Sequence, residues 1–178
     1  VLLNSDAVKE HLPEYREAIG SRAKDAAKMV HEESSMLAKQ IRQKAIAERK
    51  NLLYDGTGTN ADDYLKMVKD LHAAGYHVNL VMTDLPHEEA KKRAALRAER
   101  SGRLVPDEII DKAYKTVPVN FQRVADAADE FRVYNSNVPH GTKPPLVWSR
   151  EGGAEVTHDP KWHREFNAKV AALKSAAK

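Results

Sequence analysis

Apolar positions in this chain alternate between short continuous runs and stripes with helical spacing. Short runs end at Asp6 and Asp55, and two further apolar segments occupy 77–83 and 130–135. Such segments predict β-strands, and a run that ends in an acid is typical of a buried parallel strand. Helical stripes separate them. The predicted helices cover 7–12, about 21–47, 60–75, a segment from Pro86, 106–116, 118–128 and a terminal segment from Pro160.

Local signals set several of these boundaries. Asn60 is a good helix cap that is close to a capping box with Asp63 three residues later, and Gly75 closes the same helix. Pro118 interrupts an otherwise helical stretch and predicts that a new helix starts there. Gly152 and Gly153 between two short apolar segments predict a hairpin.

Strands and helices alternate at short spacing through the first three quarters of the chain. This order is typical of βαβ units and predicts an α/β fold with a mostly parallel sheet flanked by helices. A hairpin over 146–158 and a helix follow at the C-terminal end. The 178 residues fit a single domain with a substantial core.

The composition restricts the classes of protein to which this chain can belong. Hydrophobic residues make up 42% and charged residues 31%, which indicates a globular chain. A net charge of +3 is too small to indicate a nucleic-acid binder but suits a cleft that receives anions. The absence of cysteine excludes a disulfide framework and thiolate chemistry. No apolar run of membrane-spanning length and no signal peptide are visible, so we expect a cytoplasmic protein without a membrane partner.

The acids at the ends of the first two predicted strands are candidates for chemistry. Asp55 is followed by Gly56-Thr57-Gly58, and glycines let a backbone approach a ligand closely. An acid at this edge of a nucleotide-binding sheet faces Mg²⁺ or a substrate hydroxyl. The alternatives are an ordinary turn at Asp55 and, for Asp6, a cap on the helix over 7–12.

A basic stripe follows on the helix from Pro86. Arg93, Arg97 and Arg100 are spaced to share a face, and Arg103 follows just after it. Guanidinium groups are preferred partners of phosphate oxygens, although a solvated basic face would show the same spacing. The polar run 31–35 inside the predicted 21–47 helix is likewise either a ligand-facing patch or a solvated face.

Several motifs, in this order, resemble the zeta toxin family of P-loop small-molecule kinases. The similarity covers roughly residues 1–136 and fails to extend into the C-terminal tail. The motifs are Leu2-Leu3-Asn4-Ser5-Asp6, His31-Glu32-Glu33-Ser34, Tyr54-Asp55-Gly56-Thr57-Gly58, Arg97 with Gly102-Arg103-Leu104-Val105-Pro106, and Arg132-Val133-Tyr134-Asn135.

In that family, the bacterial toxin transfers the ATP γ-phosphate to a hydroxyl of UDP-N-acetylglucosamine and so starves wall synthesis. The resemblance implies that Asp6 is the catalytic base and that Asp55 and Thr57 line the acceptor site, with Asp55 also facing Mg²⁺ through water. An ungapped match places Lys39 where the family has a sugar-contacting glutamate. The substrate-binding residues expected on this helix are Glu33, Ser34 and Lys39.

The nucleotide side follows from the same resemblance. Arg97 and Arg103 would grip the transferring phosphoryl group. Tyr134 and Asn135 would lie near the adenine, and Arg100 is a further nucleotide-binding candidate. The implied cofactors are ATP and Mg²⁺, and the implied partners are a small-molecule hydroxyl acceptor and an antitoxin protein.

The chain departs from the family in one large respect. It contains no G-x-x-x-x-G-K-[ST] sequence. In the family this phosphate loop and its strand precede the strand that ends at Asp6, so we expect a longer parent chain that carries both ahead of Val1. Two alternatives stay open: a binding module of the same fold without catalysis, and a kinase for another acceptor, such as an antibiotic, a nucleotide or a polynucleotide end.

Overall fold

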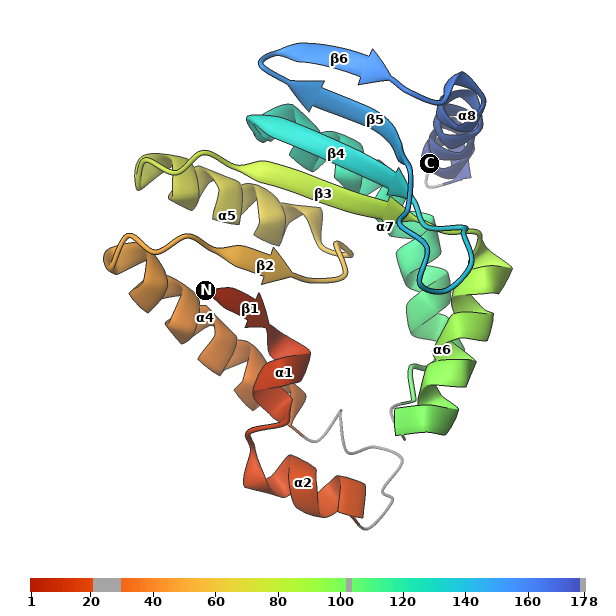
Figure 1. Cartoon of the computed structure of the whole chain (residues 1–178). Coiled ribbons are helices and arrows are strands. Elements are labelled where there is room, and N and C mark those ends of the chain that lie inside the picture. Colours follow the sequence, from red (N-terminus) through yellow and green to blue (C-terminus); the bar gives the residue numbers. More distant parts are fainter. Residues whose placement is uncertain (21–29, 102–103, 177–178) are drawn as a thin grey trace. The chain divides into compact units, whose positions relative to one another are not determined.

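The computed structural model describes residues 1–20, 30–101 and 104–176 (Figure 1). Its contacts divide the chain into two compact units. The first unit comprises Val1–Thr57 with Ala94–Val105, and the second comprises Gly58–Arg93 with Pro106–Lys178. The expectation of a single domain stays a prediction.

The first unit is built on one pair of parallel strands, β1 and β2. Leu2 lies opposite Leu53 and Asn4 lies opposite Asp55. Leu3 is buried, and a small cluster of Leu12, Tyr15 and Val30 forms a second apolar contact. The elements between residues 1 and 57 are β1 (Leu2–Asn4), α1 (Ser5–Lys9), α2 (Pro13–Gly20), α4 (His31–Ala47) and β2 (Leu53–Asp55).

Two expectations for this unit are wrong. The first strand ends at Asn4, and Asp6 lies in α1, not at a strand end. The Asn4 side chain accepts a hydrogen bond from the Ala7 amide at 3.4 Å, so Asn4 supplies the capping contact considered for Asp6. The second error concerns β2, which was expected to be buried. Leu53 is 65% exposed, and β1 is the hydrogen-bonded neighbour of β2 within the described ranges.

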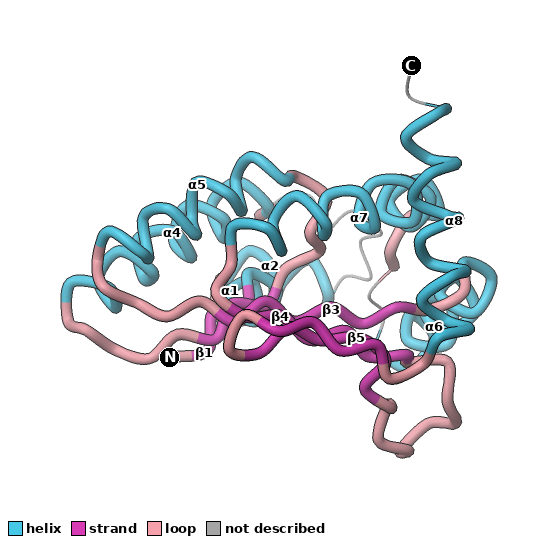
Figure 2. Tube along the Cα trace, turned by 90° about the horizontal axis from the view of Figure 1, so that it is seen from above, coloured by secondary structure: helices cyan, strands magenta, loops and turns pink. Residues whose placement is uncertain are grey.

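The second unit contains a four-stranded sheet in the order β3-β4-β5-β6. β3 and β4 are parallel, whereas β5 and β6 continue the sheet in antiparallel directions. Helices α5 and α7 lie on one face of this sheet (Figure 2). The α/β class, the hairpin and the terminal helix are confirmed. The elements are α5 (Ala61–Ala73), β3 (Asn79–Asp84), α6 (His87–Ser101), α7 (Asp107–Ala127), β4 (Glu130–Asn135), β5 (Leu146–Glu151), β6 (Ala154–Thr157) and α8 (Pro160–Ala176), and α6 continues into the first unit.

The ends of α5 follow the local sequence signals. The Asn60 side chain accepts from the amides of Asp62 and Asp63 and donates to the Asp63 carboxylate at 2.7 Å. Gly75 ends the helix with φ +80°, and the Tyr76 amide bonds back to Leu71. The Asn60 cap and the terminating glycine are confirmed, although Asp63 accepts from the Asn60 side chain and not from its backbone amide as in a full capping box.

The prediction of a helix break at Pro118 is wrong. α7 runs continuously from Asp107 to Ala127 with Pro118 inside it. Proline removes one amide donor from the helix, a local cost that packing can offset. Here Phe121 and Val124 on the following turns are buried in the core, so tertiary contacts hold the helix together across the proline.

The core of the second unit is aromatic. Phe131 and Val133 of β4 are 1% and 0% exposed. The Phe131 ring meets Phe121 of α7 edge-on at 5.6 Å and Trp148 of β5 at 4.6 Å. The terminal helix closes this core with the buried side chains Trp162, Phe166 and Val170. The predicted helical stripe of α8 is therefore core packing.

Arg150 of β5 caps the C-terminal end of α7 with hydrogen bonds. Its Nη2 donates to the carbonyl oxygens of Ala125 and Ala128, the latter at 2.6 Å. The guanidinium also lies 5.1 Å from the centre of the Phe131 ring. The last carbonyls of a helix lack partners within the helix and carry partial negative charge, so a cation at this place satisfies both needs.

We expect the Arg150→Met substitution to lower the free energy of unfolding by about 2–4 kcal/mol, because charge-assisted hydrogen bonds and a cation–π contact are lost together. Urea denaturation measures the change. Arg164→Met on the exposed surface of α8 is the matched control. A loss below about 0.5 kcal/mol, the range of ordinary surface substitutions, would contradict the assigned role.

Asp129 lies directly before β4 and binds Val78, which lies directly before β3. Its Oδ2 accepts from the Val78 amide at 2.7 Å and lies 2.9 Å from His72 Nε2. His77 Nδ1 is 3.8 Å away. The Val78 hydrogen bond, followed by the contact with His72, holds the pKa of the Asp129 carboxyl below its ordinary value of 3.8.

This lowered pKa makes stability depend on pH. A carboxyl whose pKa is lower in the folded state contributes stability above its unfolded pKa and loses it as pH falls through the folded value. We therefore expect the free energy of unfolding to fall more steeply below about pH 4 in the unchanged protein than in Asp129→Asn. Urea denaturation across this range measures both curves. Parallel curves would show that Asp129 has no such role.

Candidate functional site

The carboxyl edge of the β1–β2 pair brings two predicted site positions to one place. The register sets Asn4 opposite Asp55, and Asn4 Nδ2 donates to Asp55 Oδ2 at 2.8 Å. Asp6 follows two residues later in α1, and its side chain lies outside the described part of the structure. Asp55 and Thr57 are exposed. The backbone that carries Asp55 ends β2 at this edge, and the backbone that carries Asp6 follows the end of β1 at the same edge.

The three candidates on α4 do not share a face. Successive residues on a helix are turned by about 100°, which separates Glu33, Ser34 and Lys39 around the axis. Glu33 and Lys39 are exposed, whereas Ser34 is 0% exposed. Ala38 and Ala45 are also buried. α4 thus presents Glu33 and Lys39 on different parts of its exposed surface and keeps Ser34 inside.

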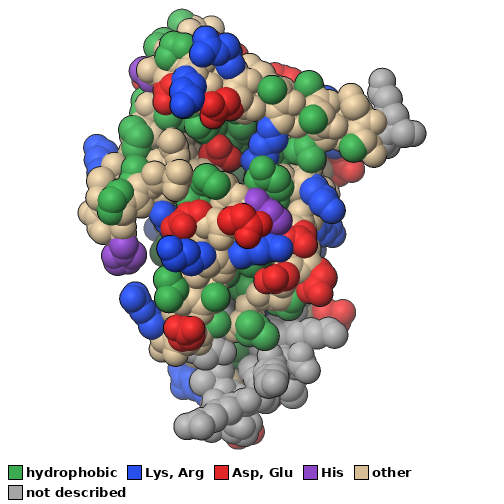
Figure 3. Space-filling view, turned by 90° about the vertical axis from the view of Figure 1, so that its right-hand side faces the viewer, with side chains coloured by type: hydrophobic (Ala, Val, Ile, Leu, Met, Phe, Trp, Pro, Cys, Tyr) green, Lys and Arg blue, Asp and Glu red, His purple; other side chains and the backbone are tan. Residues whose placement is uncertain are grey.

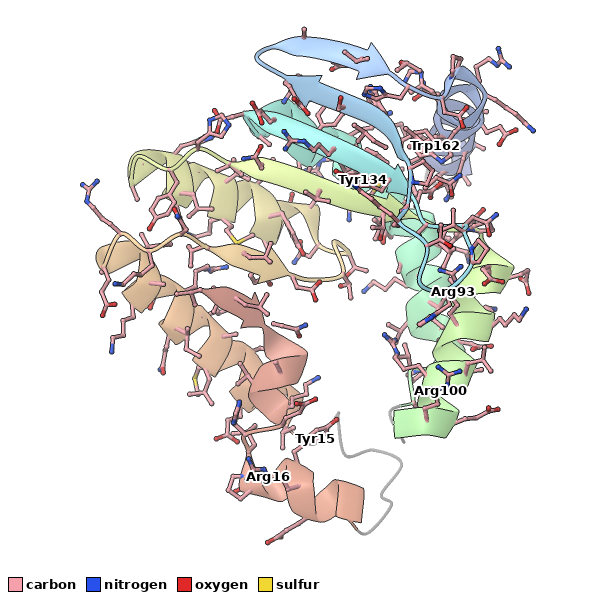
Figure 4. The ribbon with its side chains drawn as sticks, in the orientation of Figure 1. Tyr15, Arg16, Arg93, Arg100, Tyr134 and Trp162 are labelled. Atoms are coloured by element: carbon pink, nitrogen blue, oxygen red, sulfur yellow. The ribbon has the colours of Figure 1, made fainter. Side chains whose placement is uncertain are left out.

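The arginines of α6 have different surroundings. Arg97 and Arg100 are exposed on the last turns and belong to the first unit, which also contains Asp55. Arg93 belongs to the second unit, where its guanidinium contacts the loop after β4 (Figure 4). Arg103, the other predicted phosphate ligand, lies outside the described residues.

An ion cluster ties the start of α6 to α7. Asp111 of α7 accepts from Lys91 at 2.9 Å and lies 2.7 Å from His87 Nε2. The hydrogen bond from Lys91, and after it that from His87, lowers the pKa of the Asp111 carboxyl. The same bond to Asp111 raises the pKa of the Lys91 ammonium. Figure 3 shows acidic, basic and histidine side chains interspersed on the face that carries α6. Lys91 is therefore already paired with protein carboxylates.

The predicted nucleotide residues end β4. Tyr134 lies opposite Thr83 and Asn135 opposite Asp84 in the parallel ladder, and both predicted residues are half-buried. Asn135 Oδ1 accepts from the Asn137 amide at 2.9 Å, so this side chain shapes the loop that follows.

Asp84 is a residue that the sequence reasoning missed. Its carboxylate Oδ2 accepts from Trp162 Nε1 at 2.9 Å, and its Oδ1 lies 3.5 Å from Lys169 Nζ. Lys169 in turn lies over the Tyr114 ring at 4.0 Å. The rule that singled out Asp55, an acid that ends an apolar strand, would also have found Asp84.

The donor set fits magnesium only as a shared ion. The described residues contain no group of three His, Cys, Asp or Glu side chains that could hold a metal. Asp55 offers one carboxylate at the predicted edge, and Mg²⁺ at phosphoryl-transfer sites commonly has one or two carboxylates with phosphate and water completing its shell.

None of the helices among the described residues has the length and apolar character needed to cross a membrane.

Comparisons with known proteins identify the family and the fold. The family model described as Zeta toxin matches residues 1–143. Toxin zeta from Enterococcus hirae is 22% identical over 180 residues, which cover 96% of this chain and 61% of that protein. A chain solved in the structural characterization of the PezAT chromosomal toxin–antitoxin system of Streptococcus pneumoniae has a TM-score of 0.63 and 15% identity, with 97% of this chain and 75% of that chain covered.

Proposed function

This chain belongs to the zeta toxin family, and on that premise we propose that it is an ATP-dependent phosphotransferase of a toxin–antitoxin system. It moves the γ-phosphate to a hydroxyl group of a small molecule, for which UDP-N-acetylglucosamine is the first candidate. The observation that carries the proposal is the shared carboxyl edge of β1 and β2, where Asn4 lies opposite Asp55 and Asp6 follows.

On the acceptor side, Asp6 takes the proton of the acceptor hydroxyl as its oxygen forms a bond to the γ-phosphorus and the bond to the β-phosphate oxygen breaks. Asp55 and Thr57 line the acceptor site. Glu33 and Lys39 are exposed on α4 and available to polar groups of the acceptor, whereas Ser34 would have to act from a buried position.

On the nucleotide side, Arg97 and Arg103 stabilise the charge that spreads over the moving phosphoryl group. Tyr134 and Asn135 lie near the adenine, and Arg100 contributes a further positive charge. Asp55 would hold Mg²⁺ through water, and the ion would neutralise phosphate charge when bound.

The proposed kinase activity requires a phosphate loop, which would lie outside residues 1–178. The chain spans 61% of the length of the Enterococcus hirae protein, so the activity of a whole relative is carried over here only as a proposal. An antitoxin that silences the kinase is the proposed partner, in the cytoplasm.

The second candidate is a binding module of the same fold without catalysis, which would lack a G-x-x-x-x-G-K-[ST] phosphate loop. ATP turnover by the full-length protein separates the two. Incubation with ATP, Mg²⁺ and a panel of nucleotide sugars, nucleotides and aminoglycosides, followed by mass detection of phosphorylated product, is the direct test. If the chain is a kinase, we expect a product that is about 80 Da heavier than one of the tested acceptors, which is the mass of one added HPO₃ group. Binding without turnover would leave only the module.

A further inference from the structure

The Arg93 guanidinium fixes the beginning of the loop that follows β4. Nη1 donates to the Ser136 carbonyl oxygen at 3.0 Å and Nη2 donates to that of Val138 at 2.9 Å. Nε donates to Glu89 Oε1 at 2.8 Å, one turn earlier on α6. The carboxylate orients the fork and the fork holds two carbonyls, so three contacts determine its position.

The same loop is held from the sheet. The amide and the hydroxyl of Ser136 both donate to the Asp84 carbonyl oxygen at 2.9 Å. The Asn137 amide bonds to the Asn135 side chain, and the Val138 amide bonds to Ser136 at 2.8 Å. The loop start is therefore clamped between Arg93 on α6 and the end of β3.

The terminal helix supports this clamp through the Asp84 carboxylate. Trp162 Nε1 donates to it at 2.9 Å and Lys169 lies 3.5 Å away. Both residues lie beyond the part of the chain that the family model matches. Figure 4 labels Arg93 beside the loop, and Tyr134 and Trp162 on β4 and α8.

We propose that Arg93 is a positioning residue of the nucleotide site, which holds the backbone of Ser136–Val138 in the shape that receives the base. This inference rests on the proposed function, in which Tyr134 and Asn135 lie near the adenine. A loop that is ordered before binding spares the ligand the entropic cost of ordering it. Arg93 thus has a task different from the phosphate contact that its spacing with Arg97 suggests.

Arg93→Lys in the full-length protein is the sharpest test. Lysine keeps the positive charge but cannot donate to Glu89 and both carbonyls with a planar fork. We expect the affinity for a fluorescent N-methylanthraniloyl ATP analogue to fall about tenfold. We also expect faster hydrogen exchange of the Ser136–Val138 amides, and an increased KM for ATP with kcat at saturation nearly unchanged. Arg123→Lys, at a surface ion pair with Asp62, is the matched control and should change none of these.

The outcomes separate this inference from the proposed function. An unchanged affinity in Arg93→Lys, measured well below the unfolding temperature, would overturn the inference even if the loop exchanges faster or the melting temperature falls. If the lysine variant is unstable, the affinity is measured on Arg93→Gln, which removes the charge as well, and an unchanged affinity there would also overturn the inference. No binding of the analogue by the unchanged protein would overturn the proposed function, and the inference with it.

Discussion

Replacing Asp6 by alanine is expected to abolish phosphoryl transfer, with a fall in kcat of about 10³-fold or more and little change in thermal stability. General-base catalysis by a positioned carboxylate contributes about 10²–10⁴-fold, and a weakly acidic acceptor hydroxyl depends on it strongly. Asp6 lies in α1, directly after the β1–β2 edge that carries Asp55. Steady-state turnover of ATP in the presence of the acceptor measures the effect.

Two further variants make this result specific. Asp6→Asn keeps the size and most of the polarity of the side chain but cannot accept the proton, and should be as inactive as Asp6→Ala. Asp70→Ala removes an exposed carboxylate paired with Lys66 on α5 and should turn over ATP normally. Full activity in either Asp6 variant would remove this residue from the mechanism.

Replacing Arg97 by alanine is expected to lower kcat by about 10³-fold, because an arginine that stabilises a transferring phosphoryl group can contribute 10³–10⁵-fold. Arg97 is exposed on α6, so we expect the melting temperature to change little. Arg97→Lys should recover only part of the activity, since a point charge replaces the guanidinium fork. Turnover and thermal unfolding are measured on the same preparations.

Lys92→Ala, on an exposed position of the same helix, is the matched control and should retain activity. We expect Arg103→Ala to behave as Arg97→Ala does. A loss of stability in proportion to the loss of turnover would identify Arg97 as a structural residue instead.

A strand end was predicted correctly at Asp55 but not at Asp6, which lies in α1 two residues after β1 ends. An apolar run that ends at Asp55 places that residue at a sheet edge, and the structure has it there. Residues on α4 were harder to predict, because a match along the sequence takes no account of helical rotation. Ser34 and Ala38 turn inward together, which sets Ser34 apart from Glu33 and Lys39.

The basic stripe of Arg93, Arg97 and Arg100 shows the same limit of prediction from sequence. Spacing alone made Arg93 equivalent to Arg97 and Arg100, since all three fit one helical face. What distinguishes Arg93 is a loop 43 to 45 residues further along the chain, whose carbonyls it binds. Nothing in the neighbouring sequence of α6 specifies that partner.

By itself, the sequence determined the family, the alternation of strands and helices, and local boundaries such as Asn60 and Gly75, because backbone preferences and hydrophobic period act within a few residues. Only the tertiary structure decided that α7 continues through Pro118, that Arg93 holds the loop after β4, and that Trp162 bonds to Asp84 across 78 positions. Those contacts depend on which distant segments pack together, and a donor or acceptor can satisfy its hydrogen bond with many partners until packing selects one.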